Sequence, residues 1–243
     1  MAATTAWFVL DPGFNSIGEA SRAAQMPQQE FEQRVRAYLL DNPEIIFEAA
    51  QRLQARQRAT EATEGQTALK MRIDAVLRDP DSPVGGNPAG DVTLVEFFDY
   101  NCPYCRRVAP AMAQAAAADP LLRIVYKELP ILGANSMFAA KAALAAHRQG
   151  AYVAFHHGLM SEKGIVDEAA VLAAASVAGL DIERLRADME DAAIRQALDR
   201  NIELAQALRI TGTPGFVAGD QIVRGAIDLK TMQALIQKAR SGS

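Results

Sequence analysis

The stretch Val92–Ala118 limits the fold of this chain more than any other part of the sequence. It begins with the nearly continuous apolar run "VTLVEFF", which is typical of a strand buried on both faces of a parallel or mixed sheet. It ends with the alanine-rich "RRVAPAMAQAAAA", which favours a helix. Between the two lies Cys-Pro-Tyr-Cys, which holds the only 2 cysteines of the 243-residue chain. The pattern therefore predicts an α/β fold with a cysteine pair at a strand-to-helix junction.

Four interpretations of Cys102 and Cys105 are open. A structural zinc site usually has four Cys or His ligands, but the histidines lie far along the chain in helical context (His147, His156 and His157), so we predict no metal site. A structural disulfide across two residues would close a very small loop and stabilise little. An inert buried pair fits the general burial of free cysteine, but it does not explain the flanking sequence. The remaining interpretation is a dithiol/disulfide redox pair.

The junction assigns a role to each residue of this pair. Cys102 stands at the helix start, where unsatisfied N–H groups and the positive end of the helix dipole favour a thiolate. Pro103 fits the first helical turn because its missing N–H is no loss there. We expect the backbone N–H groups of Tyr104 and Cys105 to bond the Cys102 sulfur, and Pro103 and Tyr104 to tune it. Cys102 is then the attacking sulfur, and Cys105 is the resolving thiol.

A second segment, "TGTPGFV" at Thr211–Val217, completes the predicted site. Its proline stands just before a strand-like run, although a proline within a central strand would remove a ladder hydrogen bond. A cis bond between Thr213 and Pro214 would place this proline in a tight turn ahead of the strand. After that strand, Gly219 and Asp220 suit the two-residue turn of a hairpin.

Together, strand–CPYC–helix and "GTPGFV" with its hairpin resemble the thioredoxin superfamily, and specifically its DsbA-like branch. The resemblance implies a thioredoxin fold over residues 91–243 with a helical insertion at about 134–208. That insertion distinguishes the chain from glutaredoxins, which also carry CPYC. Thr213 and Pro214 would line the groove that receives the client.

Two charged residues occupy predicted strands near the cysteines. Glu96 shares a face with Leu94 and Phe98 by strand alternation, so its carboxyl is expected inside the protein, where it must be paired or protonated. The resemblance implies that Glu96 accepts the proton of the resolving cysteine. Lys127, on the neighbouring strand, is the expected partner of Glu96. The alternative is a Glu96 side chain at a strand edge that faces solvent.

Residues 28–78 form a predicted helical extension, because apolar residues recur at helical spacing on both sides of Asn42-Pro43. This segment and the Thr before Pro214 resemble the periplasmic suppressor-of-copper-sensitivity protein C group, some of whose members use the extension to oligomerise. We therefore expect a homo-oligomer. The Pro/Gly-rich residues 79–90 are expected to form a linker, and residues 1–27 a leader remnant or disordered terminus without an evident signal peptide.

Composition excludes several other functions. The formal net charge is −4, with 25 basic and 29 acidic residues interleaved, so we predict no nucleic-acid partner. No apolar run reaches the roughly 18 residues of a membrane-spanning helix. A chain whose only cysteines form a redox pair suits an oxidising compartment, and we expect the bacterial periplasm.

The sequence thus predicts a thiol-disulfide oxidoreductase, a disulfide oxidase or isomerase that needs no cofactor. Its expected partners are client proteins with cysteines and a membrane redox partner that resets the pair. A reductase remains open, because the potentials of CxxC proteins span about 150 mV and nothing in the motif fixes the value. A Cu(I) chaperone that uses the two soft thiolates also remains open.

Overall fold

The structure is a computed structural model that describes residues 27–242 of the chain. Its contacts divide the chain between Gln57 and Arg58, and the two units are described separately below. The leader remnant or disordered terminus expected over residues 1–27 lies, apart from Pro27, outside the described residues.

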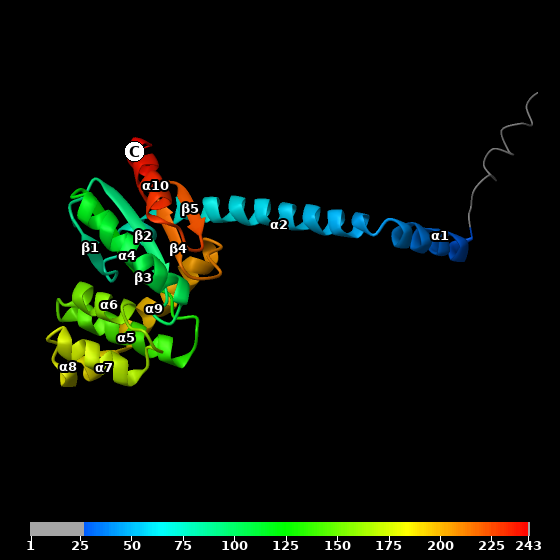
Figure 1. Ribbon diagram of the computed structural model, residues 1–243. Helices are drawn as coiled ribbons and strands as arrows, with labels where there is room; N and C mark the ends of the chain where they lie inside the picture. Colours follow the sequence, from blue (N-terminus) through cyan, green and yellow to red (C-terminus); the bar gives the residue numbers. More distant parts are fainter. Residues whose placement is uncertain (1–26, 243) are drawn as a thin grey trace, which may run out of the picture. The chain divides into compact units, whose positions relative to one another are not determined.

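The larger unit is built on a five-stranded sheet (Figure 1). Its strands are β1 (Val84–Gly86), β2 (Val92–Phe98), β3 (Leu122–Glu128), β4 (Gly215–Ala218) and β5 (Gln221–Arg224), in the spatial order β1-β3-β2-β4-β5. β2 is parallel to β3 and antiparallel to β4, so it lies in the middle of the sheet. Its apolar run is what a strand covered on both faces requires.

Alternate residues of β2 enter two apolar cores, one on each face of the sheet. Leu94 and Phe98 belong to the first core, and Val95 and Phe97 to the second. The helices that pack on the first face are α4 (Pro103–Ala118) and α10 (Leu229–Ser241), and those on the second face are α3 (Ile73–Leu77) and α9 (Ala192–Ala207). The result is a three-layer arrangement that places the N-terminus of α4 directly after β2.

The helical insertion predicted at about residues 134–208 is confirmed. Its helices are α5 (Ala134–Arg148), α6 (Tyr152–Met160), α7 (Glu168–Val177), α8 (Ile182–Met189) and α9, and Figure 1 shows α5 to α8 gathered together. The side chains of Asp167, Asp181 and Asp191 accept backbone N–H bonds at the starts of α7, α8 and α9. These caps explain why the insertion divides into short helices at these points.

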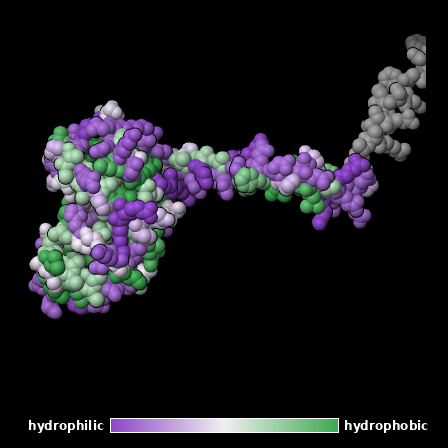
Figure 2. Space-filling view, viewed as in Figure 1, coloured by the Kyte–Doolittle hydropathy of each residue, from purple (hydrophilic) through white to green (hydrophobic). Residues whose placement is uncertain are grey.

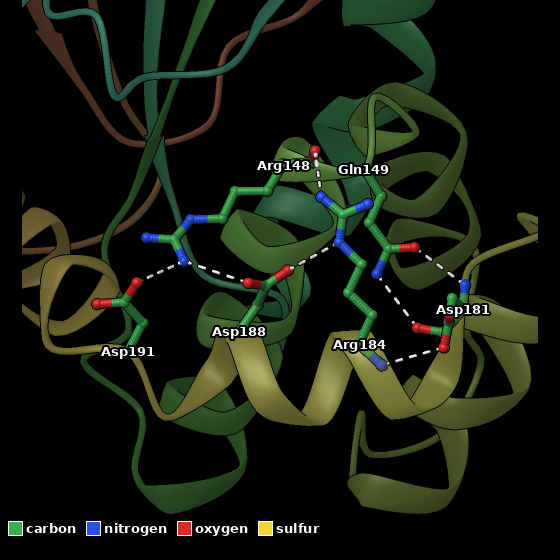
Figure 3. A network of polar contacts seen from close by, with 6 residues as sticks. All are labelled: Arg148, Gln149, Asp181, Arg184, Asp188 and Asp191. Carbon is green, nitrogen blue, oxygen red and sulfur yellow. Dashed lines mark hydrogen bonds and ion pairs between the residues drawn. The ribbon is translucent and has the colours of Figure 1, made fainter.

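A polar network fastens α5 to the ends of α8 (Figure 3). The Arg148 guanidinium lies 2.7 Å from Asp191 Oδ2 and 3.4 Å from Asp188 Oδ1. Gln149 accepts a 2.9 Å bond from the N–H of Asp181 and donates a 3.2 Å bond to its carbonyl. These contacts connect helices of the insertion at its surface, while the alanine side chains of α5 pack in its interior.

The predicted extension, residues 28–78, is helical over most of its length, but its residues from Arg58 onward belong to the larger unit. α2 (Glu44–Met71) crosses the division of the chain, and its last part buries Gly65, Ala68 and Leu69. Ala68 and Leu69 belong to the second core. A Cβ atom on Gly65 would lie 2.7 Å from the carbonyl oxygen of Leu208, so only glycine permits this approach of helix to backbone. The end of α2 is thus part of the larger unit.

The prediction that residues 79–90 form a linker is wrong, because part of this segment belongs to the sheet. Val84–Gly86 forms β1 and pairs antiparallel with β3 at the sheet edge. Its glycines serve this pairing: a Cβ on Gly85 would lie 2.9 Å from the Tyr126 ring, and Gly86 has a φ of 65°. The Pro/Gly content therefore marks a close edge strand and not a free linker.

The smaller unit, described from residue 27 to residue 57, contains α1 (Gln28–Asp41) and the beginning of α2. Within these residues α1 buries no side chain. Large apolar side chains of α1 and of the beginning of α2 are exposed: Phe31, Val35, Tyr38, Leu40, Ile46, Phe47 and Leu53. Figure 2 shows hydrophobic (green) residues among hydrophilic (purple) ones along this segment. The predicted helices are present, and their apolar residues are free for contact with another surface.

Candidate active site

The cysteine pair lies at the start of α4, as the sequence predicts. Cys102 is the N-cap residue with extended backbone, and Pro103 is the first helical residue. Cys105 follows one turn inside the helix and is fully buried, whereas Tyr104 is 53% exposed. Both thiols are free. Both cysteines are buried, and Cys102, at 3% exposed, is the less deeply buried of the two.

The segment before β4 lies against this sulfur. Cys102 Sγ donates a 3.3 Å hydrogen bond to the carbonyl oxygen of Thr213, 111 residues away in sequence. The peptide bond between Thr213 and Pro214 is cis. The two predicted parts of the site therefore come together, and the roles proposed for Thr213 and Pro214 stay predictions.

Cys105 lies in surroundings that oppose its ionisation. Burial raises the pKa of the Cys105 thiol, a hydrogen bond with the backbone of Asp99 acts in the opposite direction, and the charge of Glu96 raises the pKa further. Attack by Cys105 on a disulfide requires its thiolate.

Glu96 is the buried carboxyl that the sequence places beneath the cysteines. Its residue exposure is 2%, so the alternative of a solvent-facing Glu96 is wrong. Burial raises the pKa of Glu96 to about 8, and its Oε1 atom finds no hydrogen-bond partner among residues 27–242. A carboxyl with this pKa exchanges its proton near neutral pH, and the role of Glu96 as proton acceptor for Cys105 stays a prediction.

The expected pairing of Glu96 with Lys127 is wrong. The register of β2 and β3 places Tyr126 beside Glu96, and Lys127 beside Phe97 on the opposite face. There the Lys127 ammonium group lies 2.7 Å from Asp79 Oδ2 in an ion pair whose lysine side chain is fully buried. Successive residues of a strand point to opposite faces, so Lys127 stabilises the far side of the sheet and is not part of the cysteine site.

A second buried carboxyl, Glu128, was missed by the sequence analysis. Its Oε1 atom accepts hydrogen bonds from the hydroxyls of Tyr100, at 3.1 Å, and Tyr152, at 2.8 Å, while its Oε2 atom has no partner within the described part of the chain. Burial raises the pKa of Glu128 well above its usual range. The alternation that separates Lys127 from Glu96 is the signal that could have placed Glu128 on the cysteine side of the sheet.

His156 joins the same cluster through its Nδ1 atom, 3.2 Å from the Tyr100 hydroxyl. Burial lowers the pKa of His156 to about 3, so the imidazole is neutral at physiological pH. It is a packed core residue.

Two further searches concern metals and membranes. Within residues 27–242, no three His, Cys, Asp or Glu side chains gather closely enough to hold a metal ion. Across the same residues, no helix combines the length and apolar character needed to cross a bilayer.

Family models match two segments of the chain. The DSBA-like thioredoxin domain matches residues 93–237, which contain the sheet from β2 onward, the cysteine pair and the insertion. The copper resistance protein ScsC N-terminal domain matches residues 28–60, which lie in α1 and α2. Both predicted resemblances are thereby confirmed.

Solved structures and curated sequences agree with these matches. A thioredoxin-like oxidoreductase from Silicibacter pomeroyi DSS-3 is 48% identical, with 70% of this chain and 98% of that chain covered and a TM-score of 0.68. A linker-deleted variant of Proteus mirabilis ScsC is 31% identical, with 91% and 100% covered and a TM-score of 0.66. A Na(+)/H(+) antiporter NhaA 1 from Salinispora arenicola is 28% identical over 205 residues, which are 82% of this chain and 31% of that protein. The chain therefore spans about a third of the length of such curated relatives.

Proposed function

Because the chain belongs to the DsbA-like thioredoxin family, we propose that it exchanges thiols and disulfides with cysteine-containing client proteins through Cys102 and Cys105. The observation that supports this most directly is the position of Cys102, which stands at the N-cap of α4 and whose Sγ atom bonds the carbonyl of Thr213 and makes no capping bond to the helix. A client sulfur bound to Cys102 would lie beside the exposed edge of this segment.

Oxidation of a client proceeds in two displacements. A client thiolate attacks Cys102 Sγ of the Cys102–Cys105 disulfide, a mixed disulfide forms, and Cys105 leaves as a thiolate. Glu96 gives its proton to Cys105, whose buried thiolate is unfavourable. A second client thiolate then attacks the client sulfur of the mixed disulfide, and Cys102 leaves as the thiolate. The client has lost two electrons, and the protein has gained them.

We assign this chemistry to a disulfide oxidase or isomerase in the bacterial periplasm. An oxidase needs a membrane redox partner that reoxidises the pair, and an isomerase needs one that reduces it. The reduction potential of the pair, measured against a glutathione buffer, separates an oxidase from a reductase, the alternative that the sequence leaves open. A value of roughly −120 mV supports an oxidase, and a value of roughly −270 mV supports a reductase.

Cysteine variants test the assignment of the two sulfurs. Cys102→Ala should abolish exchange with a model disulfide, because Cys105 is fully buried. Cys105→Ala should still attack but accumulate mixed disulfides, visible on a non-reducing gel, because no internal thiol resolves them. Exchange by Cys102→Ala at the rate of the unmodified chain would refute the assignment.

Copper binding is a second candidate function. It is supported by the two soft thiolates, which suit Cu(I), and by the match of residues 28–60 to the N-terminal domain of a copper resistance protein. Titration of the reduced chain with Cu(I) should give one tightly bound ion, and prior oxidation of the cysteines should abolish it. Equal binding before and after oxidation would reject the cysteines as ligands.

We also propose that the N-terminal helices join copies of this chain into a homo-oligomer. The exposed apolar side chains of α1 and early α2 supply the contact area. Several linked sites would raise the effective concentration of a second encounter with one client, which suits isomerisation. Light scattering should give an oligomer for the full chain and a monomer for a chain that begins at Arg58. Two monomers would reject the proposal.

A further inference from the structure

Arg106, the residue after the resolving cysteine, fastens a distant loop beside the dithiol. Its Nη1 atom donates a 2.6 Å hydrogen bond to the carbonyl of Gly164 and a 3.3 Å bond to that of Glu162. Its Nε atom donates a 2.8 Å bond to the carbonyl of Tyr100. One guanidinium thus ties residues 161–166, the loop between α6 and α7 that we call the insertion loop, to the backbone before the CPYC motif.

Asn101, the residue before Cys102, secures the end of the same loop. Its Oδ1 atom accepts a 2.9 Å hydrogen bond from the N–H of Val166, and its Nδ2 atom donates a 3.2 Å bond to the carbonyl of Val166. Arg106 Nη2 donates a 3.3 Å bond to the same Oδ1 atom. The insertion loop is therefore held at both ends by the residues that flank the motif.

This attachment brings an exposed apolar side chain to the site. Val166 is fully buried, but the neighbouring Ile165 is 69% exposed. The hydrogen bonds of the surrounding loop keep the Ile165 side chain exposed to water, where it adds no hydrophobic stabilisation to the fold. Burial of this side chain by a bound molecule would be favourable.

A second loop repeats the arrangement. Asp99 accepts hydrogen bonds from the N–H groups of Ile131 and Leu132, at 2.9 and 3.0 Å. The side chains of these two residues are 43% and 52% exposed. Asp99, Asn101 and Arg106, which flank the cysteines in the sequence, therefore hold two loops that each carry exposed apolar side chains.

We propose that Arg106 is a positioning residue that gives the protein its preference for polypeptide clients over small disulfides. It holds the insertion loop so that Ile165 contacts an apolar side chain next to the client cysteine. This inference rests on the proposed function, because it concerns the molecule that exchanges with Cys102. A small disulfide such as glutathione reaches Cys102 without touching Ile165, so its exchange is independent of the loop.

The test compares two substrates on the full chain. One is a peptide with two cysteines that have leucine neighbours, and the other is glutathione, each exchanging with Cys102. In Arg106→Met, kcat/KM for the peptide should fall roughly 5- to 30-fold through KM, as expected for the loss of one apolar contact. The glutathione rate and the reduction potential should not change. Arg195→Met, which removes an exposed arginine paired with Asp199, is the matched control.

A second variant separates the contact from its support. Ile165→Ser leaves the loop anchored, and it should cause the same selective loss for the leucine peptide. Two results would overturn this inference and leave the proposed function intact. One is a fall in the exchange rate with both the peptide and glutathione in Arg106→Met, and the other is an unchanged peptide KM in either variant. A parent chain inactive toward both substrates would overturn the proposed function and the inference together.

Discussion

Replacement of the buried Glu96 by glutamine should change how stability depends on pH. The Glu96 side chain lies in the first core, where burial raises its pKa from 4.5 to about 8. The unfolded chain releases this proton near its ordinary pKa, but the folded chain retains it. Stability from this group is therefore fully present below pH 4.5 and is lost as the pH rises toward 8.

The difference between the two pKa values sets the size of the effect. Each unit corresponds to about 1.4 kcal/mol, so the shift from 4.5 to about 8 amounts to a loss of about 5 kcal/mol once ionisation in the folded state is complete. About two thirds of this loss has accumulated at pH 7. Glutamine keeps a similar shape and does not ionise, so the Glu96→Gln variant lacks the whole slope.

Denaturant unfolding of the reduced protein at intervals from pH 4 to pH 9 measures this difference. The free energy of unfolding of the variant, minus that of the unmodified chain, should rise by about 5 kcal/mol from the lowest to the highest pH. The difference cancels other groups that titrate equally in both chains. Glu190→Gln, the same substitution at an exposed position, is the matched control.

A difference that stays constant across this range would refute the reasoning, because it would mean that Glu96 titrates alike in the folded and unfolded chains. A difference that falls with pH would refute it more strongly. That sign would require a cation near Glu96 that stabilises its ionised form.

Three further predictions concern stability, measured by denaturant unfolding. Asp79→Asn should lower the free energy of unfolding by about 3 kcal/mol or more, because it leaves the buried ammonium group of Lys127 unpaired, whereas Lys127→Met should lower it less; equal losses would contradict this. Gly65→Ala should destabilise the chain, because the steric clash of a Cβ atom 2.7 Å from the carbonyl oxygen of Leu208 costs more than the gain in helix propensity of about 1 kcal/mol. A rise in stability would contradict the close packing of α2 against Leu208. Arg148→Met should cost about 1 kcal/mol or less at low salt, and less still at high salt, because its aspartate partners are partly exposed; a salt-independent loss would indicate packing instead.

The sequence predicted the elements whose signal is local. The apolar run Val92–Phe98 has the bounds of β2, and the cysteine pair stands at the start of α4 because Pro103 marks a first helical turn. In both cases, neighbouring residues carry the information. The helical insertion was predicted differently, as what the resemblance to the DsbA-like branch implies.

The errors concern contacts between distant segments. The partner of Lys127 depends on the register of β3 against β2 and on a turn 48 residues earlier, where Asp79 lies. The cluster around Glu128 needs Tyr152 from the insertion, and Gly65 needs a backbone carbonyl of Leu208. No periodicity along one segment reports such contacts, because they arise only when the elements pack.

The alternation along β3 has a consequence for how sequences of this kind can diverge. Tyr126, Lys127 and Glu128 point in turn to the cysteine side, the far side and the cysteine side of the sheet. Gain or loss of one residue upstream in this strand would exchange the faces, so that Lys127 would enter the cluster of tyrosines and Glu128 would meet Asp79. The carboxylate of Asp79 would lose its lysine partner, and Glu128 would face it without a counter-charge. Descendants can therefore vary this strand by substitution, while insertions and deletions are confined to the loops that follow it.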